Sequence, residues 1–306
     1  MKKIIMGWFC LLLCGGCYNS KAMEEDYTYL LFATPLKEHA IWLQAKAGFD
    51  QACDDYDIKC DWLGPTVIDT EEMSNVIATG ILQDADGIIT QGVVSAELIN
   101  RAKEEGIPMV LVDSDVSTSD RLAYIGKDFH AQAQLLLVDV EKRYGKEKPL
   151  KIAIQVAEQS FAIAQDQIRE IKEVFASHPG GFEIVAISES KSDPVRAKKE
   201  WHRVLAENEE INVAFALAAE SAASCMEASS ELQIRNQLLI YGVDETEENT
   251  RLVKEGKIDG LIATSFYDYG YESVEIIMRY LENKKLPKQR VYSPQLTLVN
   301  KENLDE

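Results

Sequence analysis

Apolar and polar residues follow two alternating patterns from residue 27 onward. Short apolar runs, typical of buried strands, are separated by longer segments in which apolar residues recur every three or four positions, as in amphipathic helices. The predicted strands are 27–32, 60–63, 87–90, 108–112, 122–125, 152–156, 183–187, 213–217, 238–241 and 260–263. The predicted helices are 41–56, 70–83, 95–105, 129–144, 161–177, 194–207, 221–232, 247–255 and 269–283.

This order of elements predicts the fold class. Short apolar strands separated by helices form parallel sheets with helices on both faces, so we expect an α/β protein built from doubly wound sheets. The polar segment 145–149 interrupts the series, and the same alternation starts again at Lys151. Two lobes are therefore predicted. Ligands bind outside the carboxyl ends of such strands, which makes the cleft between the lobes the expected site.

The composition agrees with a large folded chain and limits its partners. Of 306 residues, 46% are hydrophobic, enough for two cores. There are 32 Lys and Arg against 51 Asp and Glu, which gives a formal net charge of −19. Because such a charge repels phosphate backbones and anionic lipid headgroups, we expect no nucleic acid partner.

The first residues have the features of an export signal. Lys2 and Lys3 precede the apolar run 4–13. At about 1.5 Å per residue, that run is too short to span a hydrocarbon core of about 30 Å as a helix. The combination of a basic start and a short apolar run is typical of a signal peptide.

The segment Leu13-Cys14-Gly15-Gly16-Cys17 follows this run. It resembles the lipobox of bacterial lipoproteins, although Cys14 stands where those proteins usually have Leu. The resemblance implies that residues 1–17 comprise the signal peptide and the lipidated cysteine, Cys17, and that polar residues 18–26 form a tether. The alternative is an ordinary secretory signal with an incidental cysteine. In the first case the protein is extracytoplasmic and anchored to the cell membrane by its N-terminal lipid.

The cysteines beyond the signal agree with export. Cys53 lies on a predicted helix and Cys60 opens the next strand, so a disulfide between them is possible in an oxidising compartment. Two buried free thiols are the alternative, because a Cα separation cannot be obtained from sequence. Cys225 lies among Ala and Ser on a predicted helix and is expected to fill the core.

Several segments resemble one known family. They are Ile107–Asp113, Phe215–Glu220, Ile240–Asp244, Gly256–Ala263, Gly270 and Leu281–Pro287. In this order and spacing they resemble the type I periplasmic solute-binding proteins of the ribose-binding-protein-like branch, which serves sugar ABC transporters. The resemblance covers residues 27–300 and implies a binding protein rather than an enzyme, with no cofactor.

The resemblance also implies lobes that are discontinuous in sequence. The N-terminal lobe would comprise 27–127 plus 265–287, and the C-terminal lobe 128–264 plus 288–306. The chain would cross between the lobes near Gly126–Asp128, Thr264–Phe266 and Pro287–Gln289. Three crossings would confine motion to a hinge that closes the lobes on a ligand.

The resemblance assigns roles to residues of the cleft. Asp113 and Asp244 match the family's hydroxyl-binding aspartates, and Trp42 matches its stacking aromatic residue. Carboxylates that cap loops, and a tryptophan that packs in the core, are the alternatives. The side chains of His39, Gln91 and Gln167 are expected to face the same cleft, with a surface position as the alternative for His39. The aromatic run Phe266, Tyr267, Tyr269 and Tyr271 is expected near the hinge.

This sequence departs from the ribose-binding pattern at four cleft positions. Ser114 and Gln167 replace two arginines, Ala218 replaces an Asn and Thr264 replaces a Gln. We still expect Ser114 and Thr264 to contact the ligand. Loss of both arginines predicts an acidic cleft that disfavours anionic ligands.

No enzymatic motif appears in the sequence. It has no Gly-rich phosphate loop and no nucleophile elbow, and its four histidines lack metal-ligand spacing. The prediction is therefore a lipid-anchored receptor that captures a small ligand, expected to be a sugar, and delivers it to an ABC permease. The alternative is a ligand-sensing receptor that signals to a membrane sensor kinase.

Overall fold

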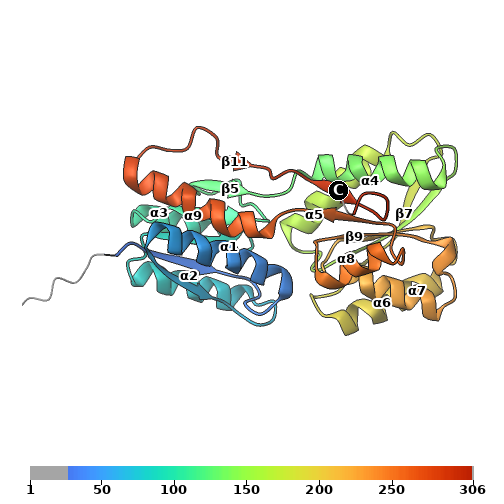
Figure 1. Ribbon diagram of the computed structural model, residues 1–306, viewed down its shortest axis with the longest axis horizontal. Coiled ribbons are helices and arrows are strands. Elements are labelled where there is room, and N and C mark those ends of the chain that lie inside the picture. Colours follow the sequence, from blue (N-terminus) through green and yellow to red (C-terminus); the bar gives the residue numbers. More distant parts are fainter. Residues whose placement is uncertain (1–26, 305–306) are drawn as a thin grey trace, which may run out of the picture.

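The computed structural model of the protein describes residues 27–304, which form two α/β lobes side by side along the long axis (Figure 1). Each lobe is built on one six-stranded sheet within this range. All strand pairs are parallel except β12 with β10, so the predicted fold class of two doubly wound parallel sheets is confirmed. The expected signal peptide, lipidated Cys17 and tether lie outside the described residues.

The first lobe has the strand order β11-β5-β4-β3-β1-β2. Its strands are β1 (Tyr29–Ala33), β2 (Lys59–Leu63), β3 (Gly87–Gln91), β4 (Met109–Val112), β5 (Ala123–Ile125) and β11 (Val291–Tyr292). Its helices are α1 (Ala40–Tyr56), α2 (Thr70–Leu82), α3 (Ala96–Glu104) and α9 (Phe266–Asn283). Leu30 and Phe32 pack under α1 and α9, whereas Leu31 and Ala33 pack under α2 and α3. This alternation explains why β1 is apolar at consecutive positions.

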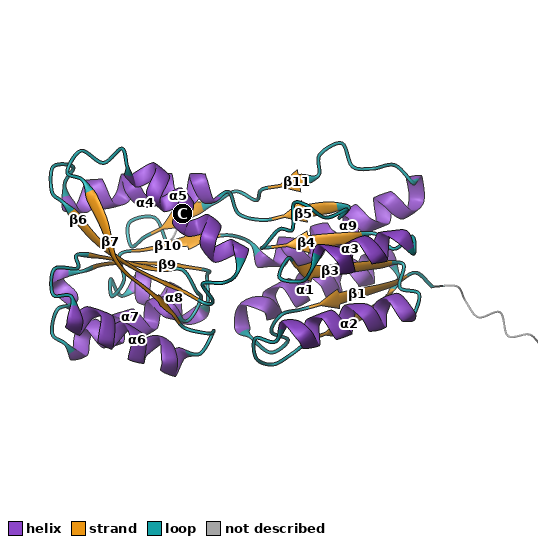
Figure 2. Ribbon diagram, turned by 180° about the vertical axis from the view of Figure 1, so that it is seen from behind, coloured by secondary structure: helices purple, strands orange, loops and turns teal. Residues whose placement is uncertain are grey.

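The second lobe has the strand order β12-β10-β9-β8-β6-β7. Its strands are β6 (Leu150–Val156), β7 (Phe182–Glu189), β8 (Val213–Ala216), β9 (Leu239–Val243), β10 (Gly260–Ala263) and β12 (Thr297–Val299). Its helices are α4 (Phe129–Tyr144), α5 (Ala162–Phe175), α6 (Pro194–Glu207), α7 (Ser221–Glu231) and α8 (Glu247–Lys254), with a short 3-10 turn, η1 (Arg235–Gln237). One core lies under α4 and α5 and the other under α6, α7 and α8 (Figure 2).

Helix α9 returns to the first lobe and packs along α1. The two helices approach closely at glycines: a Cβ on Gly270 would lie 2.0 Å from the carbonyl oxygen of Ala45, and one on Gly48 would lie 2.0 Å from that of Tyr267. The helix begins at Phe266, three residues before the predicted start, because Ser265 accepts a hydrogen bond from the Asp268 amide and caps the first turn.

The chain passes between the sheets at three places, after β5, after β10 and after β11 (Figures 1 and 2). The predicted last crossing at Pro287–Gln289 is wrong. Val291 still pairs with Tyr124 of β5, so residues 288–292 belong to the first lobe, and the chain reaches the second sheet only at β12. The sequence does not predict β11, of two residues, or β12, of three, because both are partly exposed and neither forms a distinct apolar run like that of the buried strand β5.

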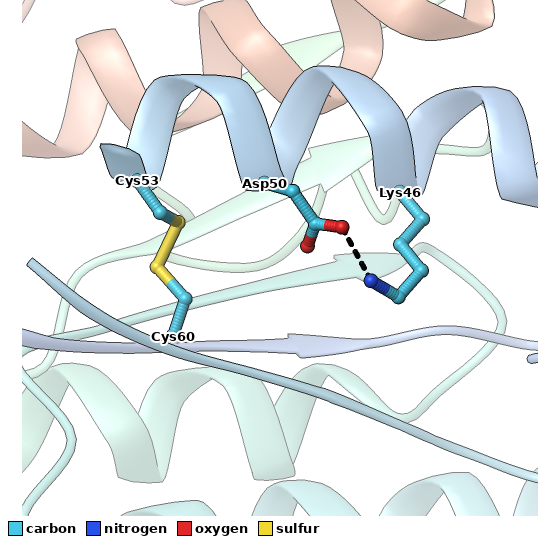
Figure 3. The surroundings of a disulfide bond; sticks show 4 residues. All are labelled: Lys46, Asp50, Cys53 and Cys60. Atoms are coloured by element: carbon cyan, nitrogen blue, oxygen red, sulfur yellow. Dashed lines mark hydrogen bonds and ion pairs between the residues drawn. A yellow bond between two sulfur atoms is a disulfide. The ribbon is translucent and has the colours of Figure 1, made fainter. Parts of the chain in front are cut away.

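A disulfide joins α1 to β2 at the end of the first lobe. Cys53 lies in the last turn of α1 and Cys60 in β2, with their Cα atoms 6.3 Å apart (Figure 3). Lys46 and Asp50 form an ion pair on the preceding turns of the same helix. Cys225 is a buried free thiol within α7, in the position expected for a core residue.

Candidate functional site

A cavity of about 110 Å³ lies between the two lobes, lined by the carboxyl ends of strands from both sheets. The first lobe contributes the segment before α1, the ends of β3 and β4, and Phe266 at the start of α9. The second lobe contributes the residues that follow β6, β8 and β9. Loops at the carboxyl ends of parallel strands therefore form both walls, as the fold class predicts.

Asp113 and Asp244 occupy equivalent places in the two lobes. Each directly follows a buried strand, β4 or β9, and each has a left-handed backbone, with φ of 63° and 66°. The Asp113 amide donates to the Ile125 carbonyl at 2.8 Å, and the Asp244 amide donates to the Ile262 carbonyl at 3.0 Å. Aspartate tolerates this conformation better than most residues. The same local turn thus places a carboxylate on each side of the cavity.

Asp113 is buried and held by neighbours of the first lobe. Gln91 Nε2 donates to its Oδ2 at 2.8 Å, and the Tyr124 hydroxyl donates to its backbone carbonyl at 3.0 Å. Burial raises the pKa of Asp113, and the nearby charge of Asp244 raises it further, whereas Lys127 and Gln91 lower it. The net pKa shift is upward, so this carboxylate carries its charge at an energetic cost.

Lys127 is a cleft residue that the sequence analysis missed. It lies at the first crossing, between β5 and α4, and its Nζ donates to Asp244 Oδ1 at 2.7 Å. The Lys127 side chain is only 3% exposed, and Nζ lies 5.1 Å from the centre of the Phe266 ring. Burial lowers the pKa of Lys127, but Asp244 and Asp113 together raise it above its ordinary value, so the group remains an ammonium ion.

Asp113, Lys127 and Asp244 are called the charged triad below. The triad thus adds one cation to a cleft for which the loss of two arginines predicts an acidic character. Further acids line the cavity: Asp69, Glu158 and Glu220. Glu158 is paired with Lys191. A charged residue two positions after the buried strand β5 is the sequence signal that could have identified Lys127.

Six of the eight sequence-predicted ligand residues line the cavity: His39, Trp42, Gln91, Asp113, Gln167 and Asp244. Ser114 and Thr264 do not. The Ser114 hydroxyl instead donates to the Gly92 carbonyl at 3.2 Å, because the left-handed turn at Asp113 directs the next side chain toward β3. Thr264 lines a separate depression together with Gln44 and Gln295.

The aromatic residues near the cleft divide into two groups. Trp42 is 5% exposed and lies edge-on to Phe266, with ring centres 5.5 Å apart, so it both packs in the core and lines the cavity. Phe161, at the start of α5, lines the opposite wall. Tyr267 and Tyr271 stack on one another, with centres 6.1 Å apart, and do not line the cavity.

His39 is the residue that caps α1. Its Nδ1 accepts from the Ile41 amide at 3.4 Å, so the ring is fixed where α1 meets the cavity. Within residues 27–304, no cluster of three or more His, Cys, Asp or Glu side chains is arranged to hold a metal ion. No helix in the same range has the length and apolar character needed to cross a membrane.

Comparison with known proteins identifies the family. The chain matches the periplasmic binding protein domain family over residues 30–285.

Three similar solved structures show the same fold. One is the glucose-galactose binding protein GanP from Geobacillus stearothermophilus, at 22% identity and TM-score 0.85, with 92% of this chain and 100% of that chain covered. Another is the XylFII-LytSN complex, at 24% identity and TM-score 0.83, covering 90% and 99% of the two chains. A third is an ABC transporter solute binding protein from Agrobacterium vitis with bound D-fucose, at 18% identity and TM-score 0.82, covering 91% and 97%. The predicted resemblance is therefore confirmed, and the chain belongs to the periplasmic binding protein domain family.

Proposed function

We propose that the protein is an extracytoplasmic receptor that captures a small sugar between its lobes and delivers it to an ABC permease. The observation that carries this proposal is the cavity itself, which brings a carboxylate from each lobe, amide side chains and aromatic rings together. Carboxylates and amides pair with sugar hydroxyls, and aromatic rings cover the apolar face of a sugar ring. Similar structures described as binding glucose and galactose, arabinose or D-fucose support a sugar as the ligand class.

Closure of the lobes would couple ligand capture to delivery. Asp113 belongs to the first lobe and Asp244 to the second, so a ligand that binds both carboxylates holds the lobes together. Three chain crossings form the hinge about which the lobes would move.

Titration of the purified mature protein tests the proposal. Calorimetry with D-glucose, D-galactose, L-arabinose, D-fucose and D-allose should detect at least one ligand, and the same sugar should raise the melting temperature, because it binds the native state. X-ray scattering at saturation should show a smaller radius of gyration. Absence of binding to every sugar, with glycerol and myo-inositol as controls, would contradict a sugar receptor, and identical scattering curves would contradict closure.

Anchoring through Cys17 is part of the proposal. The Gly-Gly-Cys sequence after a short apolar run supports it. A single acyl chain binds membranes only marginally, so lasting attachment needs more than one chain. The Cys17→Ala variant should move from the membrane fraction to the soluble fraction of exported protein, and an unchanged distribution would exclude lipid anchoring.

The second candidate is a receptor that reports its ligand to a membrane sensor kinase. The observation that favours it is a similar structure solved as a complex of two proteins, XylFII and LytSN. Genes beside the coding sequence distinguish the two roles: a permease and an ATPase favour transport, and a kinase with a response regulator favours sensing.

A further inference from the structure

Lys127 differs from the other charged groups of the cleft in its position. It lies at the first crossing of the hinge, whereas Asp113 and Asp244 end strands inside the two lobes. Its Nζ is bonded to Asp244 and acts electrostatically on Asp113. Because all three residues line the cavity, a ligand held there by both carboxylates is also within reach of Lys127.

The hydrogen bonds of the charged triad leave a defined set of free positions. Gln91 occupies Oδ2 of Asp113, and Lys127 occupies Oδ1 of Asp244. Within the described residues no donor is bonded to Asp113 Oδ1 or Asp244 Oδ2, and Asp244 is the one acceptor bonded to the Lys127 ammonium, which has three N–H donors. Neither free carboxylate oxygen is sealed from solvent, and all three residues of the triad line the cavity.

The free positions therefore present acceptor, donor and acceptor to the cavity. A complementary ligand has a hydroxyl donor on each side of an oxygen that accepts. In a free cyclic sugar the hydroxyls both donate and accept, whereas the ring oxygen only accepts. The ring oxygen is thus the sugar atom that can pair with the ammonium but with neither carboxylate.

We propose that Lys127 is a specificity-determining residue that donates a hydrogen bond to the ring oxygen of a cyclic sugar while Asp113 and Asp244 accept from its hydroxyl groups. This inference rests on the proposed function and names the chemistry of the same site. Lys127 would supply one positive charge from the hinge, where the sequence has Ser114 and Gln167 in place of two arginines. Cyclitols, which have hydroxyls but no ring oxygen, would lack this hydrogen bond and bind more weakly.

A purely structural role for Lys127 makes a different prediction. If Lys127 only neutralises the aspartates, its removal weakens the binding of all ligands equally, whether their ring atom is oxygen or sulfur. If it binds the ring oxygen, its removal abolishes the preference for oxygen over sulfur at that position, because sulfur is a weak acceptor.

The test compares wild type, Lys127→Met, Lys127→Arg and the control Lys142→Met by calorimetry. Lys142 is exposed and pairs with Glu302, so its removal takes away one charge far from the cleft. The probes are D-glucose, D-galactose and D-xylose with their 5-thio analogues, and myo-inositol.

Wild type and Lys142→Met should bind at least one oxygen sugar about tenfold or more tightly than its 5-thio analogue, since a charge-assisted hydrogen bond contributes at least that factor. Lys127→Met should bind both forms within roughly threefold, and Lys127→Arg should retain part of the preference. The effect of sulfur size is present in every variant and cancels in the comparison.

An unchanged preference in Lys127→Met overturns the inference while the receptor function stands. If Lys127→Met does not fold, wild-type binding decides: equal affinity for oxygen and 5-thio sugars, or tight binding of myo-inositol, overturns the inference. Failure of wild type to bind any of the three oxygen sugars also overturns it, and failure with every sugar overturns the proposed function as well.

Discussion

Asp113 and Asp244 occupy equivalent turns, yet only the replacement of Asp244 with Asn should destabilise the protein. Asn is suited to this comparison because it matches Asp in shape and tolerates the left-handed backbone that both positions require, with φ of 63° and 66°. The two substitutions therefore remove a charge without adding backbone strain. Any difference between the variants reports the electrostatic surroundings of each carboxylate.

Asp244→Asn should destabilise the protein. It removes the charge opposite Lys127, whose side chain is 3% exposed. Breaking a buried ion pair by deleting one partner costs about 3–5 kcal/mol, but here the amide oxygen still accepts from Lys127 and Asp113 still provides a nearby negative charge. We therefore expect a loss of about 1–2 kcal/mol, and a melting temperature lower by roughly 2–6 °C.

Asp113→Asn should leave stability unchanged or raise it by up to about 1 kcal/mol at neutral pH. Burial is the main cause of the raised pKa of Asp113, so its ionised form disfavours the folded state. A group with a raised folded pKa contributes stability only at low pH, and that contribution is lost as the pH rises through the folded pKa. The advantage of the Asn variant should accordingly be present at neutral pH and disappear as the solution is acidified.

Urea denaturation and calorimetric melting of the ligand-free proteins measure both effects. Equal destabilisation by the two substitutions would refute the argument, because it would mean that Lys127 does not distinguish the two carboxylates. A more stable Asp244→Asn variant would refute it more strongly. Ligand must be absent, since a bound sugar stabilises the native state in its own right.

Other parts of the structure lead to further expected outcomes. Reduction of the bond between Cys53 and Cys60, or replacement of both by Ser, should lower stability by about 2 kcal/mol, because the short loop closed by the bond loses its constraint in the unfolded chain; intact mass with alkylation, with and without reductant, checks that the bond forms in exported protein. Gly270→Ala should destabilise by about 1–2 kcal/mol although alanine favours helices, because its Cβ would meet the Ala45 carbonyl at 2.0 Å. Gly80→Ala is the matched control in urea denaturation, since its Cβ meets only the end of a Leu side chain.

Most of the fold could be predicted because its strands and helices are long enough to show a period. Helix α6 begins and ends at the residues that the pattern indicates, since Pro194 at its first position and the apolar positions that follow mark it clearly. The errors fall where local pattern is absent. Strand β11 has two residues and is held by pairing with Tyr124, a contact that no short sequence window contains.

The charged triad shows the same limit in the site. Asp113 and Asp244 could be found because each follows an apolar strand, at a position that resembles one of the family's hydroxyl-binding aspartates. Lys127 is also preceded by a strand, but its partner Asp244 lies 117 residues away. Its role depends on how the two lobes meet. Ser114 does not line the cavity, because its hydroxyl is bonded to Gly92, which is also distant in sequence.

The balance of charge in the triad indicates which ligands the cleft can accept. Two carboxylates and one ammonium leave a net charge of −1, and Asp69 and Glu220 add negative charge to the walls, where Glu158 is paired with Lys191. An anionic ligand would bring like charge to Asp113, whose ionised form burial already disfavours, and a cationic ligand would compete with Lys127 for the same oxygens. A neutral polyhydroxyl ring meets neither difficulty, because it supplies donors to the free carboxylate oxygens and an acceptor to the ammonium.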